Sequence, residues 1–142
     1  MAAVLTVGSI LVSLKEIRNL DYTVLLCAKL AETRAFYKDI MGFPLEDDLE
    51  NWVSFRVGAT LLTLRPRGQD PAGGTDGSVE EGSAAVQLAF RVPPRVIAAC
   101  RNELVEAGLP IVRDLTDLPS VQHRTLFFRD PEGNLIEIYA EY

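Results

Sequence analysis

Short runs of alternating hydrophobic and polar residues make up most of this chain, and a pattern of helical spacing follows the first of them. A short β-rich run begins at Asp21. After it, apolar residues recur at helical spacing from Leu30 to Ile40, ahead of Gly42. Three strand candidates come next, around Leu45, at Trp52–Val57 and at Thr60–Arg65. The first half of the chain therefore predicts the order β-α-β-β-β.

The same order of elements begins again in the second half. Ala85–Val92 alternates as a strand, Pro93 and Pro94 lead into a helix with one apolar stripe, and Gly108 ends that helix. Three further strands are predicted at Ile111–Arg113, His123–Arg129 and Asn134–Tyr139. A repeat period of about 65 residues is too long for a solenoid unit and indicates the duplication of one supersecondary module.

A single domain with two modules follows from this repeat. Residues 67–83 are rich in Pro, Gly and acidic residues and carry no periodicity, which is typical of a linker. We therefore predict one α+β domain over residues 21–142, with module one at 21–66 and module two at 84–142. Each module buries one face of its sheet under its helix, so the two βαβββ modules should form a curled mixed sheet, a cup lined by alternate strand residues.

Residues 1–20 are interpreted as an appendage of this domain. Apolar residues follow helical spacing from Val4 to Ile17, and Ser13 with Glu16 has the spacing of a capping box. The segment lacks a leading basic residue and is too short for a membrane span, which argues against a signal peptide or an anchor. We expect it to pack on the domain or on a partner subunit.

Charge and cysteine content limit which kinds of binding partner are expected. Fourteen basic and twenty acidic residues give a net charge of −6, which repels both nucleic acid and anionic membranes. Cys27 and Cys100 belong to no spaced Cys/His set, which favours free thiols in a cytoplasmic protein, although one long-range disulfide stays open. These features leave a small molecule and a second copy of the chain as the expected partners.

Two segments resemble one protein family. Asp21–Phe43, with its triplet Ala35–Tyr37, is similar to the opening of vicinal-oxygen-chelate proteins, the superfamily of glyoxalases, bleomycin-resistance proteins and extradiol dioxygenases. Phe127–Glu137, with the turn Asp130-Pro131-Glu132-Gly133, resembles that superfamily's signature hairpin. The likeness covers roughly residues 20 to 140 and implies the glyoxalase/bleomycin-resistance fold.

The resemblance also implies positions for a divalent metal, held by one side chain from the first and last strands of each module. These positions fall on Tyr22, Thr63, Gln87 and Glu137. Tyr and Thr bind metals poorly at neutral pH because each must first lose a proton of high pKa. We therefore expect no tightly bound catalytic metal; a divalent metal, if present, would use Gln87 and Glu137.

Period-two alternation predicts the rest of the cup. If Gly133 takes the left-handed conformation of a three-residue hairpin loop, Phe127 pairs with Glu137, and Thr125 pairs with Tyr139. The predicted ligand-binding residues are Tyr22, Trp52, Thr63, Gln87, Arg91, Thr125, Phe127, Glu137 and Tyr139. Glu137 interrupts an apolar strand, and His123 is the only histidine, so these two are the candidates for acid or base chemistry. The alternatives are a salt bridge from Glu137 to Arg65 or Arg91 and a bystander role for His123.

Two classes of function remain. The first is a small-molecule binding protein without a catalytic metal, similar to the drug-sequestering resistance members of the family. The second is a metal-dependent lyase, isomerase or oxygenase that uses Gln87, Glu137 and His123. The missing ligands favour the first class, and the sequence leaves open whether the protein is an enzyme. Exposed sheet edges and the apolar appendage predict a homodimer.

Overall fold

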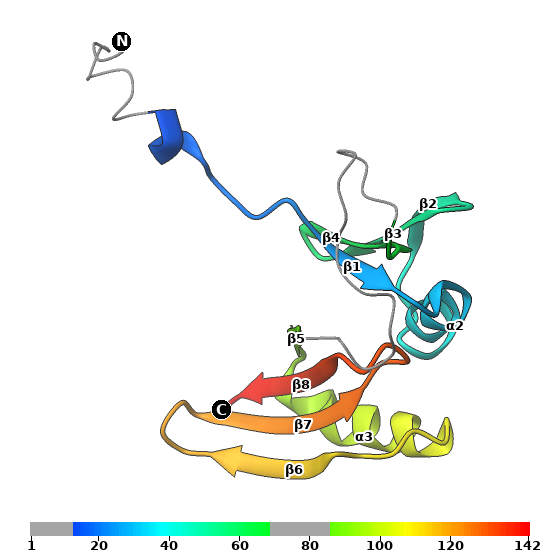
Figure 1. The fold of residues 1–142 in the computed structure, drawn as a ribbon. Coiled ribbons are helices and arrows are strands. Elements are labelled where there is room, and N and C mark those ends of the chain that lie inside the picture. Colours follow the sequence, from blue (N-terminus) through cyan, green and yellow to red (C-terminus); the bar gives the residue numbers. More distant parts are fainter. Residues whose placement is uncertain (1–12, 69–85) are drawn as a thin grey trace.

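The computed structural model describes residues 13–68 and 86–142 (Figure 1). A short 3-10 helix, η1 (Leu14–Glu16), precedes the first module. That module consists of β1 (Tyr22–Cys27), α2 (Leu30–Ala35), the π-helix η2 (Phe36–Ile40), β2 (Leu45–Leu49), β3 (Trp52–Val57) and β4 (Thr60–Pro66). The second consists of β5 (Gln87–Arg91), η3 (Pro94–Val96), α3 (Ile97–Glu106), β6 (Arg113–Leu118), β7 (His123–Arg129) and β8 (Leu135–Glu141). None of the helices in these ranges is long and apolar enough to cross a bilayer.

Each module folds into its own four-stranded mixed sheet. The strand orders are β1-β4-β3-β2 and β5-β8-β7-β6, so the two sheets have the same topology. In each sheet the first strand runs parallel to the last, and the remaining pairs are antiparallel. This arrangement confirms the predicted α+β fold with two βαβββ modules. We refer to the two sheets as the first sheet and the second sheet.

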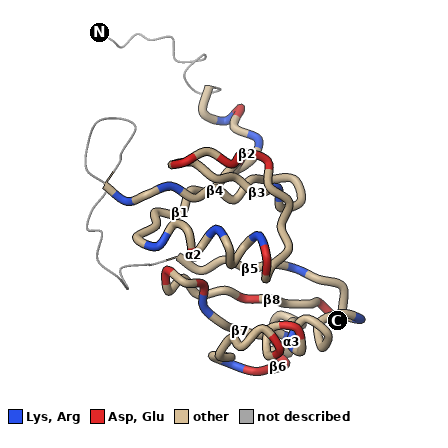
Figure 2. Tube along the Cα trace, turned by 90° about the vertical axis from the view of Figure 1, so that its right-hand side faces the viewer, with Lys and Arg blue, Asp and Glu red and all other residues tan. Residues whose placement is uncertain are grey.

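Most predicted strands lie where the alternation placed them, and β6 is the exception. β3 and β7 have the predicted bounds, whereas β6 begins where the predicted strand Ile111–Arg113 ends. β6 lies at the edge of its sheet, and charged pairs flank it: Arg101 with Asp114 and Arg124 with Asp117. These residues replace the apolar alternation that marks a strand with one buried face. The edge strands β2 and β6, which occupy the same place in the two sheets, both carry acidic residues (Figure 2).

Both sheets turn one face toward a single shared core. Its buried members from the first sheet are Leu25, Cys27, Val53, Phe55, Leu62 and Leu64, and those from the second are Leu126, Phe128, Ile136, Ile138 and Ala140. The first module's helical segment contacts both sheets. The ring of Tyr37 lies 6.2 Å from that of Phe55 in the first sheet, and the ring of Phe36 lies 6.3 Å from that of Phe128 in the second. The modules are thus joined by a continuous apolar interior.

The β7–β8 hairpin fastens the modules together. The Glu132 carboxylate accepts hydrogen bonds from the backbone N–H groups of Ala28, at 2.9 Å, and of Lys29, at the start of α2. It also lies 3.7 Å from the guanidinium of Arg67, and both side chains are almost fully buried. Arg67 and Gly68 fall within the predicted linker 67–83, and residues 69–83 of that linker lie outside the described ranges.

A second carboxylate completes this hairpin. Asp130 accepts four hydrogen bonds: from the Tyr37 hydroxyl at 2.6 Å, from the Glu132 backbone N–H, and from the backbone and side-chain N–H groups of Asn134. Gly133 is left-handed, with φ of 92°, as the predicted hairpin loop requires. We call Asp130, Glu132 and the groups they bind the hairpin clasp. It holds the second module against the first module's helix.

The N-terminal arm, residues 13–21, extends away from the two sheets (Figure 1). All of its residues are exposed, and Ser13 makes no side-chain capping hydrogen bond to η1. The predicted capping box is therefore wrong, because η1 is a single 3-10 turn rather than an α-helix. The predicted helical positions Val4, Val7 and Leu11 lie outside the described residues.

Candidate functional site

The face of each sheet that points away from the shared core carries the predicted site residues. On the first sheet, Tyr22 and Trp52 meet edge to face, with ring centroids 6.2 Å apart. Thr63 is fully buried, and its hydroxyl shares a 2.8 Å hydrogen bond with the hydroxyl of Ser54. The polar groups at the centre of this face therefore satisfy each other.

The second sheet presents a more polar open face. Phe127 pairs with Glu137 and Thr125 with Tyr139 across β7 and β8, and Ala89 lies beside Glu137 across β5 and β8. The predicted hairpin register is thus confirmed, because the loop at Gly133 set it correctly. Gln87 and Arg91, from the edge strand β5, are exposed, whereas Phe127, Glu137 and Tyr139 are half-buried.

Glu137 is held by one neighbour on this face. The Gln87 side-chain amide donates a hydrogen bond of 3.3 Å to the Glu137 carboxylate, whereas Arg91 pairs instead with Glu141 at 3.0 Å. Of the partners considered from the sequence, Gln87 is thus in contact and Arg91 binds another acid. A bond of 3.3 Å is at the long end of the usual range, so the carboxylate keeps most of its capacity to accept hydrogen bonds.

Thr125 lies in the middle of the same face with its polar group unsatisfied. The residue is fully buried, and its hydroxyl oxygen has no hydrogen-bond partner in the part of the chain that the structure describes. Leaving a buried hydroxyl without a partner costs roughly 1–3 kcal/mol, so such groups are uncommon in native proteins. Because the side chains around it cover this hydroxyl, its missing hydrogen bond is a local cost to the stability of the second sheet.

His123 borders this face but makes no close pair with an acid. Its ring stacks on the ring of Tyr139, with centroids 4.4 Å apart, and its Nε2 atom lies 4.0 Å from a Glu141 oxygen. A separation of 4.0 Å is too long for a hydrogen bond. His123 therefore serves as an aromatic wall in this arrangement.

The two open faces do not meet within one chain. Each sheet turns its other face toward the shared core, so Tyr22 and Thr63 point away from that core on one side, and Gln87 and Glu137 on another. The sequence placed all four on the lining of one cup and left open whether that cup closes within one chain or across a dimer. The sequence pattern defined the correct faces, but the packing of the modules separates them.

The side chains at the metal positions that the resemblance implies do not form a set of metal ligands within one chain. Gln87 and Glu137 provide one amide and one carboxylate, and Thr63 is already engaged by Ser54. Among residues 13–68 and 86–142, no group of three or more His, Cys, Asp or Glu side chains lies close enough to hold a metal ion. The donor set of one chain does not fit a divalent metal, which normally takes three or more strong ligands.

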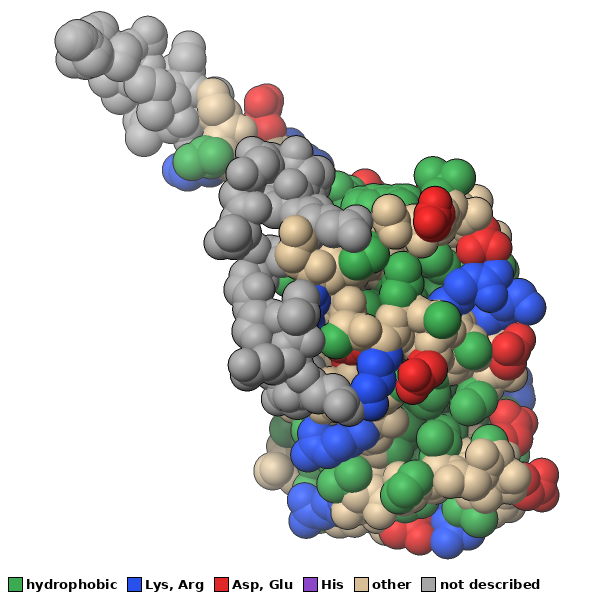
Figure 3. Space-filling model, turned by 45° about the vertical axis from the view of Figure 1, so that its right-hand side comes forward, with side chains coloured by type: hydrophobic (Ala, Val, Ile, Leu, Met, Phe, Trp, Pro, Cys, Tyr) green, Lys and Arg blue, Asp and Glu red, His purple; other side chains and the backbone are tan. Residues whose placement is uncertain are grey.

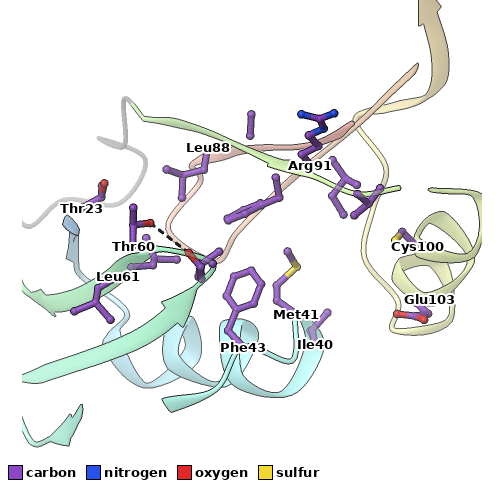
Figure 4. Close-up of a pocket in the computed structure, with 17 residues that line it drawn as sticks. Thr23, Ile40, Met41, Phe43, Thr60, Leu61, Leu88, Arg91, Cys100 and Glu103 are labelled. Atoms are coloured by element: carbon purple, nitrogen blue, oxygen red, sulfur yellow. Dashed lines mark hydrogen bonds between the residues drawn. The ribbon is translucent and has the colours of Figure 1, made fainter. Parts of the chain in front are cut away.

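A cleft of about 570 Å³ lies between the modules, away from Glu137. Ile40, Met41 and Phe43 form its floor and Leu88 of β5 its roof; Thr23 and Thr60 stand at one end and Cys100 and Glu103 at the other (Figure 4). Phe90 also lines the cleft, and its ring lies 5.2 Å from that of Phe43. Of the predicted site residues only Arg91 lines it. The sequence did not predict this cleft, because much of its lining, such as Leu88 and Phe90, consists of core-facing positions that the packing of the modules leaves partly uncovered.

The free thiols differ in environment. Burial, followed by the negative charges of Glu132 and Asp130, raises the pKa of Cys27 to about 12, so this thiol stays protonated. Burial and then Glu103 raise the pKa of Cys100, which is half-buried. Neither thiol has the lowered pKa of a catalytic nucleophile.

Comparisons with known proteins place this fold in a family. The chain is 31% identical over 108 residues to the "Uncharacterized protein YraH" of Bacillus subtilis, covering 73% of this chain and 84% of that protein. It is 25% identical over 131 residues to the "Virulence protein STM3117" of Salmonella typhimurium, covering 86% and 83%. The crystal structure of a glyoxalase/bleomycin resistance protein/dioxygenase from Nocardioides superposes with a TM-score of 0.75 at 20% identity, covering 94% of this chain and 91% of that one.

The family model spans nearly the whole described domain. Residues 19–138 match the Glyoxalase/Bleomycin resistance protein/Dioxygenase superfamily, in agreement with the duplicated βαβββ topology. The chain belongs to this superfamily.

Proposed function

We propose that the protein binds a small organic molecule on the open face of the second sheet, without a tightly bound catalytic metal. The observation that carries the proposal is the half-buried Glu137 carboxylate, whose one hydrogen bond among the described residues is a 3.3 Å contact with the Gln87 amide. A ligand with a donor group over this face binds the remaining acceptor positions of the carboxylate.

The chemistry of the face defines the class of ligand. Glu137 favours a positive charge or a hydrogen-bond donor, and the aromatic rings of Phe127 and Tyr139 on either side favour a planar apolar body. The net charge of −6 also attracts cations. The proposed ligand is therefore a planar molecule with an amine, amidine or similar donor group.

A second copy of the chain completes the cup in this proposal. The open face of the first sheet, with Tyr22 and Trp52, points away from Glu137 of the same chain. Placing that face of one copy over the second sheet of another encloses the ligand and covers the edge strands β1 and β5. Light scattering at micromolar concentration should give the mass of a dimer, and the mass of one chain would contradict this part of the proposal.

Glu137→Gln tests the binding site, with benzamidine as a planar cationic probe. The substitution keeps the shape of the side chain and removes its charge, so calorimetry should show binding weakened by about 10- to 150-fold, equivalent to about 1.5–3 kcal/mol for a charge-assisted hydrogen bond. Glu106→Gln, on the exposed side of α3, changes the net charge equally and should leave binding unchanged. Equal losses in both variants would mean that general charge, not the site, attracts the probe.

Metal analysis separates this proposal from the metal-dependent enzyme. Protein purified without chelator should contain much less than one divalent ion per chain, in the wild type and in Glu137→Gln alike. Stoichiometric metal in the wild type that disappears in Glu137→Gln would overturn the metal-free proposal, because a neutral amide does not replace a carboxylate on a divalent ion.

A further inference from the structure

We propose that the N-terminal arm of each chain docks into the cleft between the modules of a second copy. Leu14, Ile17 and Leu20 of the arm would enter the cleft beside Met41 and Phe90 of the partner. The proposal concerns a different surface from the ligand face and does not rest on the proposed function.

The arm carries an apolar stripe that nothing covers in this structure. Leu14, Ile17 and Leu20 are 77%, 70% and 74% exposed, the largest exposed fractions among the large hydrophobic residues of the described chain. They recur every third residue, beginning in the 3-10 turn of η1. Large apolar side chains exposed together in this way mark an interaction surface.

The cleft is the matching concave surface. Its floor and roof are apolar, and Met41, Phe43, Leu88 and Phe90 are only partly buried although they pack against the core. The volume of about 570 Å³ is in the range of sites that enclose several side chains or a small molecule. Glu103 stands at one end of the cleft (Figure 4). In the proposed complex its negative charge attracts Lys15 and Arg18 of the incoming arm.

The direction of the arm favours a partner's cleft over its own. The Leu61 backbone N–H donates a 3.2 Å hydrogen bond to the Asp21 carbonyl, which continues the line of β1 beyond Tyr22. From there the arm runs outward from the body of the protein (Figure 3). To enter the cleft of its own chain, it would have to reverse direction within residues 17–21, where Ile17 is extended. If two copies exchange arms, each arm is buried and each cleft is filled. The two copies then form a closed pair with two-fold symmetry.

A cross-link to the native Cys100 tests the proposal. Cys100 lines the cleft, and Cys27 is only 3% exposed and protected from reagents. In Ile17→Cys, a short bis-maleimide should therefore join residue 17 of one copy to Cys100 of the other and double the mass of the chain on a denaturing gel. The product should be lost in Ile17→Cys/Cys100→Ser. Val121→Cys, at a turn with 54% exposure, is the matched control and should give little cross-linked dimer.

The outcomes decide between the possible occupants. A cross-link within one chain, shown by mass spectrometry without a doubled mass, would mean that the arm folds into its own cleft and would overturn the proposal. No reaction with Cys100 of either copy would overturn it as well. A dimer that persists in Ile17→Cys/Cys100→Ser would place two arms against each other instead.

A variant with a polar arm provides a second, independent measurement. Leu14→Ser/Ile17→Ser/Leu20→Ser changes only exposed side chains, so the fold should persist, as thermal unfolding would verify. The dimer dissociation constant from sedimentation should rise at least tenfold. An unchanged constant would contradict arm docking, whereas benzamidine binding reports separately on the open face of the second sheet.

Discussion

The same two strands, β7 and β8, carry acidic residues in two opposite situations. At their hairpin, Asp130 and Glu132 are buried and accept hydrogen bonds from four and two N–H or O–H groups, respectively, with Arg67 close to Glu132. Only a few residues away on the open face, Glu137 accepts one long hydrogen bond, and Thr125 has a buried hydroxyl without a partner among the described residues.

This difference distinguishes acids that hold the fold from acids that are available to a ligand. A buried carboxylate that is bonded within the protein is closed to a ligand, and removing it breaks contacts within the protein. A carboxylate with few hydrogen bonds contributes little to the stability of the fold, and its remaining acceptor positions are available to a ligand. The following three experiments test this comparison, from the largest expected effect to the smallest.

The same substitution at the two sites should give very different losses of stability. Glu132→Gln removes the charge opposite Arg67 and turns an amide N–H₂ toward backbone N–H donors, so the free energy of unfolding should fall by about 3–5 kcal/mol. Glu137→Gln should change it by less than about 0.5 kcal/mol. Urea unfolding of both variants measures the two values. Similar losses at both sites would remove the distinction between clasp and ligand face.

Alkaline pH should weaken the clasp. Burial and neighbouring acids raise the pKa of Cys27 to about 12 from 9.0, and burial and then Asp130 raise the pKa of Tyr37 well above 10.0. In the unfolded chain both groups lose protons at their ordinary pKa, so the unfolded state binds fewer protons, and stability falls as pH rises above about 9.

The expected loss is about 2–3 kcal/mol between pH 8.5 and 10.5, because each raised group contributes up to about 1.4 kcal/mol per pH unit above its unfolded pKa. Urea unfolding over this range measures the slope. The slope should be shallower in Tyr37→Phe, which removes one of the two groups. A flat profile in the wild type would show that neither group stays protonated in the folded protein.

Removing the unsatisfied hydroxyl should stabilise the protein slightly. Thr125→Val keeps the shape and eliminates the buried unpaired oxygen, so the free energy of unfolding should rise by about 1 kcal/mol. Thr63→Val, whose hydroxyl is bonded to Ser54, is the control and should instead destabilise by about 1 kcal/mol. A loss of stability in Thr125→Val would mean that its hydroxyl already has a partner.

The local sequence pattern was sufficient to predict most of the helices and strands and the register of the second sheet. The bounds of β3 and β7, the left-handed Gly133 and the pairing of Phe127 with Glu137 all depend on residues close in sequence. Such features follow from alternation and turn chemistry. β6 was misplaced because its charged edge residues hide the alternation.

The arrangement of the modules was beyond the reach of the sequence. It depends on contacts such as Tyr37 with Asp130 and Phe36 with Phe128, between residues about ninety positions apart. The two-residue alternation along a strand shows which of its faces is buried. It does not show which other module packs against that face. For the same reason the sequence assigned the Asp130-Pro131-Glu132-Gly133 segment only a turn, whereas Glu132 also binds the start of α2.

The hairpin clasp makes the two halves of this duplicated chain unequal. The corresponding turn of the first module, around Gly58, contains no acidic residue, so α3 receives no carboxylate from it. The second module thus caps the first module's helix, whereas the turn around Gly58 in the first module does not cap α3. A gene fragment encoding the first module alone would lose that cap, and two first modules in tandem would lack it altogether. The order of the two modules along the chain therefore matters, although their topology is the same.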